Sequence, residues 1–429
     1  MCHPEFEGVS HCGILNANAE PESRNDVDYP PSSPEPLGSR VKRLRIGVIY
    51  GGRSSEHEVS LASAAAVIAN IDRARYEPIP IRIDKDGRWT IADLPPTASS
   101  TAQVIRQTVH LEAAPSTRPS REAHLVARPS KETLLTIQRG KVAPESGEHE
   151  RALITGVAVD VIFPVVHGPY GEDGTLQGLL ELANVPYVGA GVLASAVGMD
   201  KAVMKTLFAA RRLPIVKHVV VWRRDWTADR AATVRAVTGR LSFPMFVKPA
   251  NLGSSVGITK AKDQHGLEAG LDLAVDFDRK VIVERAVPKA REIECAVLGN
   301  DRLEASLPGE VVPSREFYSY EAKYLDEGSA LLVPAPLTKR QTQQVRRLAV
   351  EACLAIDGAG MARVDFLMTR DTGRLYLNEL NTIPGFTTIS MYAKLWAASG
   401  VDYPALLDRL IHLALERHAE KQQRRTSLM

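Results

Sequence analysis

The first clear pattern in the chain is a run of apolar residues over positions 44–50 that stops at two glycines. A short apolar run that ends at glycines is typical of a strand buried on both faces. An Ala-rich segment follows, and Ser55 with Glu58 three positions later fits a capping box, which marks the start of a helix. The pattern therefore predicts a buried strand, a glycine turn and a helix.

Strand and helix patterns alternate through the N-terminal half. Apolar runs at 77–83 and 159–166 predict two further buried strands, and helices are predicted at 175–183 and 200–211. Between the two strands, residues 93–150 contain clusters of Thr, Ser, Pro and Arg with weak periodicity, which suggests an inserted loop or a small appendage. This alternation is typical of an open α/β domain.

From about residue 214 the pattern changes to short strands that suit hairpins, with helices between them. The predicted strands are 218–222, 243–248, 256–260, 281–284 and 292–298, and the predicted helices are 227–239, 264–276, 339–356 and 403–421. The last helix places four leucines on one stripe, which is typical of an amphipathic helix. We predict two α+β units after the α/β domain, and three divisions in all, at 44–197, 198–290 and 291–429.

Residues 1–43 form a block of their own, in which prolines crowd among Ser, Glu and Asn. A segment with so few periodic apolar residues cannot offset the entropy cost of ordering it, so we predict a disordered tail. The first residues lack a basic region followed by an apolar one, and no secretory signal is expected.

Composition narrows the class of protein. The chain has 429 residues, and its 53 Lys and Arg against 51 Asp and Glu give a formal net charge of +2. That balance predicts no broad nucleic-acid surface, because polyanion binding needs a large excess of cations. No apolar run approaches the roughly 18 residues needed to span a bilayer. The four cysteines are too few and too scattered for a disulfide framework or a zinc site, and we expect a cytoplasmic protein.

Two familiar nucleotide-binding motifs are absent from the sequence. The glycines at 51 and 52 lack the third glycine of G-x-G-x-x-G, and Gly140-Lys141 is followed by Val142 rather than by Ser or Thr. A dinucleotide site and a P-loop are both disfavoured.

A better phosphate candidate is Lys248, at the end of a predicted strand and followed by the turn GSSVG at 253–257. An ammonium group can meet a phosphate there, and the turn offers successive backbone N–H groups without a large side chain in the way. An ordinary Gly-Ser hairpin loop would have the same sequence pattern.

A second candidate lies on a predicted hairpin, whose strands 362–369 and 375–381 are joined by Asp371-Thr372-Gly373. A regular three-residue turn with Gly373 in the left-handed position places Asp365 opposite Glu379, and Arg363 opposite Asn381. Side chains two apart share a face of a strand, so all four project from one patch. Oxygen ligands of this kind suit Mg²⁺. The alternative is a charge network in which Arg363 simply neutralises Asp365.

Two loops also carry chemical groups. The sequence HGPYGEDG at 167–174 follows a buried strand, at the position where open α/β sheets place ligands. In the alternative it is a glycine-rich connection in which Glu172 or Asp173 caps the next helix. The segment 308–334 is long and contains Tyr and Lys residues, which is typical of a lid, although a solvated surface loop would look alike.

Together these motifs resemble those of the D-alanine–D-alanine ligases of the ATP-grasp superfamily. The strings GGRSSEHEVSL, HGPYGEDG, KPANLGSSVG, YEAKY, ARVDF and NELNTIPG occur in the order and spacing of that family. The resemblance implies an α/β and α+β chain: an N-terminal open, Rossmann-like domain followed by a two-domain ATP-grasp fold. It also implies that ATP phosphorylates the carboxylate of one D-alanine and that the amine of a second attacks the acyl phosphate.

The resemblance assigns a role to individual positions. It implies that Glu56 binds the ammonium of the first D-alanine, that His167 lies beside that site, and that Arg363 stabilises the oxyanion. The remaining implied residues are Lys201, Lys248 and Ser255 for phosphate, Glu284 and Glu292 for adenine and ribose, Asp365, Glu379 and Asn381 for two Mg²⁺ or Mn²⁺ ions, Ser254, Lys323 and Tyr324 for the lid and the reacting groups, and Gly385 with Ser390 for the second D-alanine.

The implied function is ATP-dependent synthesis of D-alanyl-D-alanine for peptidoglycan precursors by a cytoplasmic homodimer, with small molecules as its other partners and neither nucleic acid nor membrane among them. Relatives that make D-alanyl-D-lactate change the residue at the position of Tyr324, so a dipeptide product is favoured here. The alternatives are a D-alanine–D-lactate ligase, another ATP-grasp ligase, and a nonenzymatic ATP-binding protein of the same fold. A dehydrogenase is disfavoured by the missing third glycine.

Overall fold

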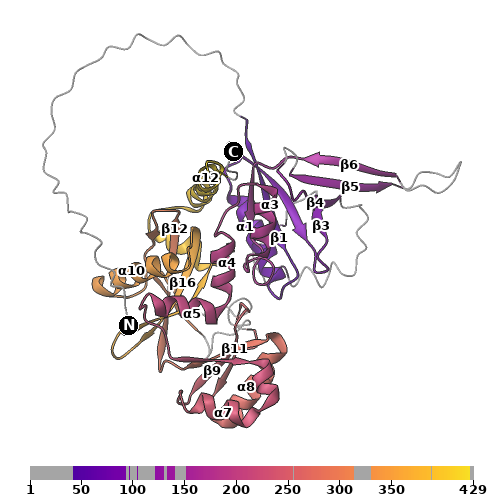
Figure 1. Cartoon of the computed structure of the whole chain (residues 1–429). Helices are drawn as coiled ribbons and strands as arrows, with labels where there is room; N and C mark the ends of the chain where they lie inside the picture. Colours follow the sequence, from indigo (N-terminus) through magenta and orange to yellow (C-terminus); the bar gives the residue numbers. More distant parts are fainter. Residues whose placement is uncertain are drawn as a thin grey trace, which may run out of the picture. The chain divides into compact units, whose positions relative to one another are not determined.

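A computed structural model describes residues 42–92, 96, 104, 121–129, 133–140, 151–254, 256–313, 330–387 and 389–425 (Figure 1). The chain divides into two units, Met1–Val41 and Lys42–Met429, and all described residues belong to the second. The tail predicted at 1–43 lies outside the described residues except for its last two positions. Its disorder therefore stays a prediction.

The first sheet has seven strands in the order β6-β5-β4-β3-β2-β1-β7. β1 runs parallel to β2 and β7, and all other neighbours are antiparallel. The strands are β1 (Leu44–Gly51), β2 (Tyr76–Ile83), β3 (Trp89–Ile91), β4 (Arg121–Leu125), β5 (Leu134–Gly140), β6 (Arg151–Val157) and β7 (Val161–Pro164). Ile46 and Val48 of β1 pack with α1 (His57–Asn70), whereas Ile49 packs with α3 (Thr175–Ala183), so helices cover both faces of this strand.

The described part of segment 93–150 is not an inserted loop, and the second alternative, a small appendage, stays a prediction. Strands β4 and β5 lie within it and continue the first sheet by antiparallel pairing. Their buried positions include Ala123, Leu134 and Thr136. Small or polar residues at buried positions give little apolar alternation in a sequence, which is why the strands were missed.

The capping box predicted at Ser55 and Glu58 is also wrong. Helix α1 has Glu56 as its N-cap residue, without a capping hydrogen bond from that side chain. Ser54 Oγ accepts from the backbone N of Glu56 at 3.2 Å and donates to the carbonyl of His167 at 2.9 Å. A capping box does occur elsewhere, where Thr338 and Gln341 start α10 (Lys339–Ala355).

The second sheet has four antiparallel strands in the order β10-β9-β11-β8. They are β8 (His218–Trp222), β9 (Met245–Pro249), β10 (Thr259–Ala261) and β11 (Lys280–Arg285), and they share a core with helices α6 (Arg223–Ala228), α7 (Arg230–Thr238) and α8 (Gln264–Phe277). β9 ends at the loop that was predicted to bind phosphate.

The third sheet has the order β15-β14-β12-β16-β17, with β13 paired to β12. Its strands are β12 (Ala290–Gly299), β13 (Glu304–Ala305), β14 (Gly309–Val312), β15 (Ala330–Leu332), β16 (Gly360–Thr369) and β17 (Leu375–Asn381). Helices α4 (Val192–Met199), α5 (Lys201–Ala210) and α10 contribute to the same core as β12, β16 and β17. Three sheets agree in number with the three predicted divisions, whose boundaries at 44–197, 198–290 and 291–429 stay predictions.

The β16–β17 hairpin has the predicted pairing at its far end but not near the turn. Asp365 pairs with Glu379 and Arg363 with Asn381, which confirms the expectation, whereas Phe366 pairs with Leu377. The register shifts between positions 365 and 366 because Asn378 is an extra residue on β17. The turn is one residue longer than expected, since Thr369 N bonds to Arg374 O at 3.0 Å, and Gly373 has the predicted positive φ of 64°. The extra residue in the turn and the extra residue in the bulge offset each other, so the pairing of Asp365 with Glu379 is the predicted one.

The C-terminal helix α12 (Tyr403–Gln422) contacts α1, β7 and β16, and α11 (Met391–Ala398) packs beside it. Leu406, Leu407 and Leu410 are fully buried with Ile46 of β1 and Phe386, which follows β17. Residues from the first and third sheets therefore share a core, and the loops that follow β7 and β17 lie next to each other.

Candidate active site

Arg363 and Asp365 form the centre of a charged cluster on the exposed face of β16. From position 362 to the end of this strand, odd-numbered positions are partly exposed and even-numbered positions are buried, so both side chains leave the same face. Arg363 donates from Nε to Asp365 Oδ1 and from Nη2 to Asp365 Oδ2, each at 2.7 Å. Asn381 Nδ2 also donates to Asp365 Oδ2, at 3.0 Å. In this structure Arg363 neutralises Asp365, as the alternative interpretation of the hairpin proposed.

Lys201 and Glu379 bring a second pair of charges to this patch. Lys201 is the first residue of α5, and Asp200 caps that helix by accepting from the backbone N of Ala202 and Val203. The Nζ of Lys201 donates to the carbonyl of Leu252 at 2.6 Å and lies 3.7 Å from Glu379 Oε2. The start of α5, the phosphate-loop candidate and the hairpin therefore meet at one ammonium group.

Lys248 lies in a buried cluster with Glu284 and Lys205. Lys248 Nζ is 2.6 Å from Glu284 Oε2, and Lys205 Nζ is 2.8 Å from Glu284 Oε1. Burial opposes ionisation of all three groups. The two ammonium groups nevertheless hold the pKa of Glu284 well below its ordinary value, and Glu284 helps to raise the pKa of Lys248. Burial lowers the pKa of Lys205 despite the attraction of Glu284.

The bulge on β17 brings Asn378 to the same region. Regular alternation would turn Asn378 away from the face that carries Glu379, but both residues are partly exposed. Asn378 Oδ1 accepts from Lys248 Nζ at 3.4 Å. Bulges commonly redirect a side chain next to a site. Here the bulge directs Asn378 towards Lys248 and Glu379 towards Lys201.

Glu56, the N-cap residue of α1, lies in a narrow space next to the loop after β9. Its carboxylate accepts a hydrogen bond from Ser254 Oγ. A Cβ added at Gly253 would come within 2.7 Å of Glu56 Oε2, and one added at Gly168, whose φ is +75°, within 2.6 Å. Only glycines at these positions leave the carboxylate in place.

His167 connects three parts of the chain. Its Nδ1 lies 3.0 Å from the carbonyl of Ile383, which can only accept, so Nδ1 carries the proton. Nε2 then accepts from Ser63 Oγ at 2.9 Å, and Ser63 Oγ accepts from the backbone N of Phe386 at 3.2 Å. Burial lowers the pKa of His167 to about 4. The imidazole is neutral and fully bonded, so it orients neighbouring loops rather than moving a proton.

Glu172 is a further carboxylate next to Glu56, and it does not cap the following helix. Its oxygens accept from the backbone N of Gly168 at 2.7 Å and from the backbone N of Ile383 at 3.1 Å. Asp173 is bonded to the start of that helix instead, through the backbone N of Thr175 at 2.9 Å. Burial and the charge of Glu56 raise the pKa of Glu172. Glu172 thus connects the loop after β7 to the loop after β17.

Gly385 and Ser390 lie in the loop after β17, close to each other. A Cβ added at Gly385 would come within 2.8 Å of Ser390 Oγ. Ser390 Oγ accepts from the backbone N of Thr387 at 3.0 Å and shares a hydrogen bond with Thr387 Oγ1 at 2.7 Å. The backbone at Gly385 and the hydroxyl of Ser390 therefore form one compact polar turn.

The remaining expected site residues are only partly placed. Glu292 lies on β12, partly exposed, and its charge contributes to the raised pKa of Lys248. Ser255, Lys323 and Tyr324 lie outside the described residues, and their roles stay predictions.

The oxygen groups of the hairpin suit a divalent cation. The carboxylates of Asp365 and Glu379 belong to paired positions of two strands, with the amide of Asn381 bonded to Asp365. Within the described ranges, no three His, Cys, Asp or Glu side chains lie close enough together to hold a metal ion. The donor set therefore fits an ion that keeps waters and phosphate oxygens as ligands, as Mg²⁺ does, better than a closed protein cage.

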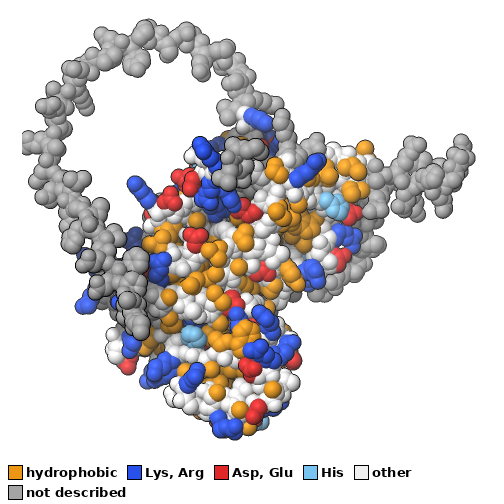
Figure 2. All heavy atoms as spheres, viewed as in Figure 1, with side chains coloured by type: hydrophobic (Ala, Val, Ile, Leu, Met, Phe, Trp, Pro, Cys, Tyr) orange, Lys and Arg blue, Asp and Glu red, His pale blue; other side chains and the backbone are white. Residues whose placement is uncertain are grey.

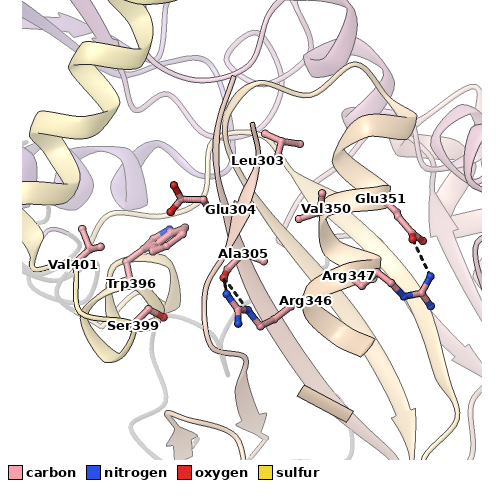
Figure 3. A pocket seen from close by; sticks show the side chains of 10 residues that line it. All are labelled: Leu303, Glu304, Ala305, Arg346, Arg347, Val350, Glu351, Trp396, Ser399 and Val401. Atoms are coloured by element: carbon pink, nitrogen blue, oxygen red, sulfur yellow. Dashed lines mark hydrogen bonds and ion pairs between the residues drawn. The ribbon is translucent and has the colours of Figure 1, made fainter. Parts of the chain in front are cut away.

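The surface pocket in Figure 3 is separate from these residues. It has a volume of about 640 Å³ and lies between residues of β13, α10 and α11, where Arg346 and Trp396 line it. Arg346 donates to the carbonyl of Ala305 at 3.0 Å and 2.8 Å, and Arg347 pairs with Glu351. The lining includes none of the expected site residues.

Surface charge on the described residues gives no sign of a polyanion site on the face in view. There, Lys and Arg side chains lie in several separate groups among Asp, Glu and apolar side chains (Figure 2). The described part of the chain also contains no helix long and apolar enough to cross a membrane.

Comparison with known proteins agrees with the geometry. The family model described as D-ala D-ala ligase N-terminus matches residues 45–190, and that described as D-ala D-ala ligase C-terminus matches residues 207–412. A D-alanine–D-alanine ligase of Heliobacterium modesticaldum is 47% identical over 387 residues, which are 90% of this chain and 98% of the relative.

Two solved structures have the same fold. The D-alanine–D-alanine ligase of Coxiella burnetii has a TM-score of 0.72 and 36% identity, over 89% of this chain and 96% of its own. The VanG D-Ala:D-Ser ligase of Enterococcus faecalis has a TM-score of 0.73 and 33% identity, over 87% of this chain and 100% of its own.

The three-sheet fold and the lysine–carboxylate site define a ligase with the ATP-grasp fold. More narrowly, the chain belongs to the D-alanine–D-alanine ligase family, and membership of this family implies the use of ATP.

Three residues of the charged cluster were not expected from the sequence: Lys205, Asn378 and Glu294, whose Oε2 lies 3.1 Å from Arg363 Nε. Lys205 follows Lys201 by one helical turn, and Glu294 follows Glu292 by two strand positions, so each pair shares a face. Periodicity could have found these two. Asn378 depends on a bulge, which left no signal in the sequence. Glu172 belongs to the loop at 167–174 that the sequence singled out, but its contact with Ile383 depends on tertiary packing.

Proposed function

We propose that this enzyme joins two D-alanine molecules at the expense of ATP to give D-alanyl-D-alanine, ADP and phosphate. The observation that carries the proposal is the β16–β17 hairpin, which presents Arg363, Asp365, Glu379 and Asn381 on one patch next to Lys201. Such a patch can bind the phosphoryl group during its transfer and can stabilise the negative charge that develops in the reaction.

The first step transfers the γ-phosphoryl group of ATP to the carboxylate of the first D-alanine. Lys201 and Lys248 would neutralise the phosphate oxygens, because positioning and charge neutralisation are the main requirements of phosphoryl transfer. Ser255 would add its hydroxyl, and Glu284 with Glu292 would bind the adenine and ribose end. Lys205 holds Glu284 from the buried side.

One or two Mg²⁺ or Mn²⁺ ions, held by Asp365, Glu379 and Asn381, would supply further neutralisation of the phosphates. In the second step, the amine of the second D-alanine attacks the acyl carbon, and a tetrahedral oxyanion forms before phosphate leaves. Arg363 would stabilise that oxyanion, and its two hydrogen bonds of 2.7 Å to Asp365, which orient the guanidinium, support this role.

Glu56 would bind the ammonium of the first D-alanine, and Ser254 would keep the carboxylate oriented. His167 and Glu172 support this site through the loop after β17. Gly385 and Ser390 of that loop would receive the second D-alanine through a backbone amide and a hydroxyl. Lys323 and Tyr324 would close over the reacting groups.

The other expectations complete the proposal. The chain would have three domains, at 44–197, 198–290 and 291–429. The enzyme acts as a homodimer in the cytoplasm, where ATP and D-alanine are available for peptidoglycan precursor synthesis.

Product analysis tests the proposal. The protein is incubated with ATP, Mg²⁺ and D-alanine, alone and with equal D-lactate or D-serine, and the products are separated by mass. D-alanyl-D-alanine as the main product in every mixture supports the proposal. Exclusive formation of D-alanyl-D-lactate or D-alanyl-D-serine would replace it with the corresponding ligase.

A further inference from the structure

A third carboxylate stands beside the Arg363–Asp365 pair and has no place in the motifs. Glu294 on β12 is directly opposite Asp365 on β16, which is directly opposite Glu379 on β17. Residues paired in this way project from the same face of a sheet. Glu294 Oε2 lies 3.1 Å from Arg363 Nε, the nitrogen that also donates to Asp365. Arg363 is therefore shared between two carboxylates on neighbouring strands.

The shared contact matters because Asp365 has two tasks that compete. Both of its oxygens accept from Arg363 in this structure, yet the proposed function asks the same oxygens to bind a divalent cation. A cation at Asp365 repels the guanidinium and takes over its acceptors. A largely buried guanidinium without a carboxylate partner is costly, so Arg363 would then need another acceptor.

Glu294 is that acceptor. Its side chain is 10% exposed, against 18% for Arg363 and 13% for Asp365, so the contact is shielded from water. Glu294 therefore adds a carboxylate to the face that carries Asp365 and Glu379. Arg363 keeps this partner, and can stay in place, when a cation binds Asp365.

We infer that Glu294 is a positioning residue for Arg363: it holds the guanidinium on the site face when Asp365 turns to a divalent cation. The inference rests on the proposed function for the role of the metal. Glu294 lowers the cost of separating Arg363 from Asp365, so it strengthens metal binding at the site and keeps the arginine directed at the oxyanion.

The sheet provides a matched control on another strand. Arg291 donates to Glu310 from Nε at 2.8 Å and from Nη2 at 2.6 Å, and it also donates to the carbonyl of Pro336. Glu310 pairs with Ile293 in the register of β14 and β12, so its side chain leaves the face opposite to Glu294. Glu310→Asp shortens another largely buried carboxylate partner of an arginine, away from the site.

The test is an equilibrium titration that needs no turnover. Full-length protein saturated with ADP is titrated with Mn²⁺, and free Mn²⁺ is followed by electron paramagnetic resonance. Glu294→Asp keeps the charge but withdraws it from Arg363, and we expect the Mn²⁺ dissociation constant to rise about tenfold. Glu310→Asp should leave it unchanged, and thermal unfolding checks that each variant is folded.

A double-mutant cycle shows whether Glu294 acts through Arg363. In the Arg363→Ala background, Glu294→Asp should no longer change the Mn²⁺ dissociation constant. An equal tenfold change in both backgrounds would overturn the inference, because Glu294 would then act on the metal directly. Wild-type affinity in Glu294→Asp, or no Mn²⁺ binding by the unmodified protein, would also overturn it. Because D-alanine is absent from this experiment, failure to form the dipeptide would count against the proposed function alone.

Discussion

Arg363 and Asp365, two positions apart on β16, are joined by two parallel hydrogen bonds of 2.7 Å each. The planar guanidinium matches the carboxylate in this bidentate geometry. The pair fixes the one arginine that the proposed mechanism directs at the tetrahedral intermediate.

Arg363→Lys should therefore lower kcat by about 10²–10³-fold, because an ammonium cannot reproduce the fixed donor geometry at a developing oxyanion. ATP binding should change by less than about threefold, since the stronger phosphate contacts come from the lysines. Steady-state kinetics and ATP titration measure the two effects. Arg291→Lys is the control, since Arg291 forms the same bidentate pair away from the site, and comparable loss of kcat in both variants would contradict the assigned role.

Gly253→Ala tests the space around Glu56. The added Cβ would lie 2.7 Å from Glu56 Oε2 and displace that carboxylate. The KM for the first D-alanine should rise roughly 10–100-fold, because small displacements of a positioning group are costly, while the KM for ATP stays close to that of the unmodified enzyme.

Gly178→Ala provides the matched control for that substitution. Gly178 lies in α3, where nothing approaches within 4 Å of an added Cβ. Alanine there should leave both KM values unchanged and stabilise the helix by up to about 1 kcal/mol. Equal KM values for D-alanine in the two variants would show that Glu56 does not depend on the glycine.

Lys205 tests the buried cluster. Lys205→Met removes one of two ammonium groups from Glu284. The free energy of unfolding should fall by about 3 kcal/mol, since a buried carboxylate loses a partner. In the double variant Lys205→Met/Glu284→Gln, part of that loss should return. Urea unfolding measures both, and an unchanged midpoint in Lys205→Met would mean that the contact contributes nothing.

His167 predicts a specific loss of stability in acid. Burial lowers its pKa in the folded protein to about 4 from the usual 6.5. Between these two pH values the unfolded chain binds a proton at this residue and the folded chain does not. The stabilisation is present above pH 6.5 and is lost as the pH falls towards 4. Between pH 7 and pH 5 this amounts to about 2 kcal/mol.

His167→Gln should remove that share of the pH dependence, because Gln can donate and accept without titrating. Unfolding at pH 7 and pH 5 measures it for the variant, for the unmodified protein and for His265→Gln, which changes an exposed residue of α8. The same pH dependence in His167→Gln and in the unmodified protein would contradict the buried neutral state.

Strong local patterns predicted the fold well. Strand β8 has the predicted bounds, and helix α8 is within one residue of them, because apolar periodicity and flanking turn residues both mark these elements. Strands β4 and β5 were missed because their buried face includes Ala123 and Thr136. The predicted capping residue of α1 was wrong, because the hydroxyl that accepts from the backbone N of Glu56 belongs to Ser54 rather than to Ser55.

The site was predictable where it depended on one hairpin. Pairing of Asp365 with Glu379 follows from turn length and alternation, and the bulge at Asn378 cancels the error in the turn. Contacts between distant loops, such as Glu172 with Ile383, arise only from tertiary packing. Local periodicity carries no information about them, and a resemblance to a family supplied the roles of Glu56 and Ser390 instead.

The most direct test of the central claim follows oxygen atoms through the reaction. D-alanine labelled with ¹⁸O in both carboxylate oxygens is incubated with the enzyme, unlabelled ATP and Mg²⁺, and the phosphate and the dipeptide are analysed by mass spectrometry. If the carboxylate attacks ATP and the acyl phosphate is then attacked by an amine, each phosphate carries one ¹⁸O and the new amide carbonyl keeps the other. Dipeptide accompanied by unlabelled phosphate, or ADP formed without dipeptide, would contradict the account.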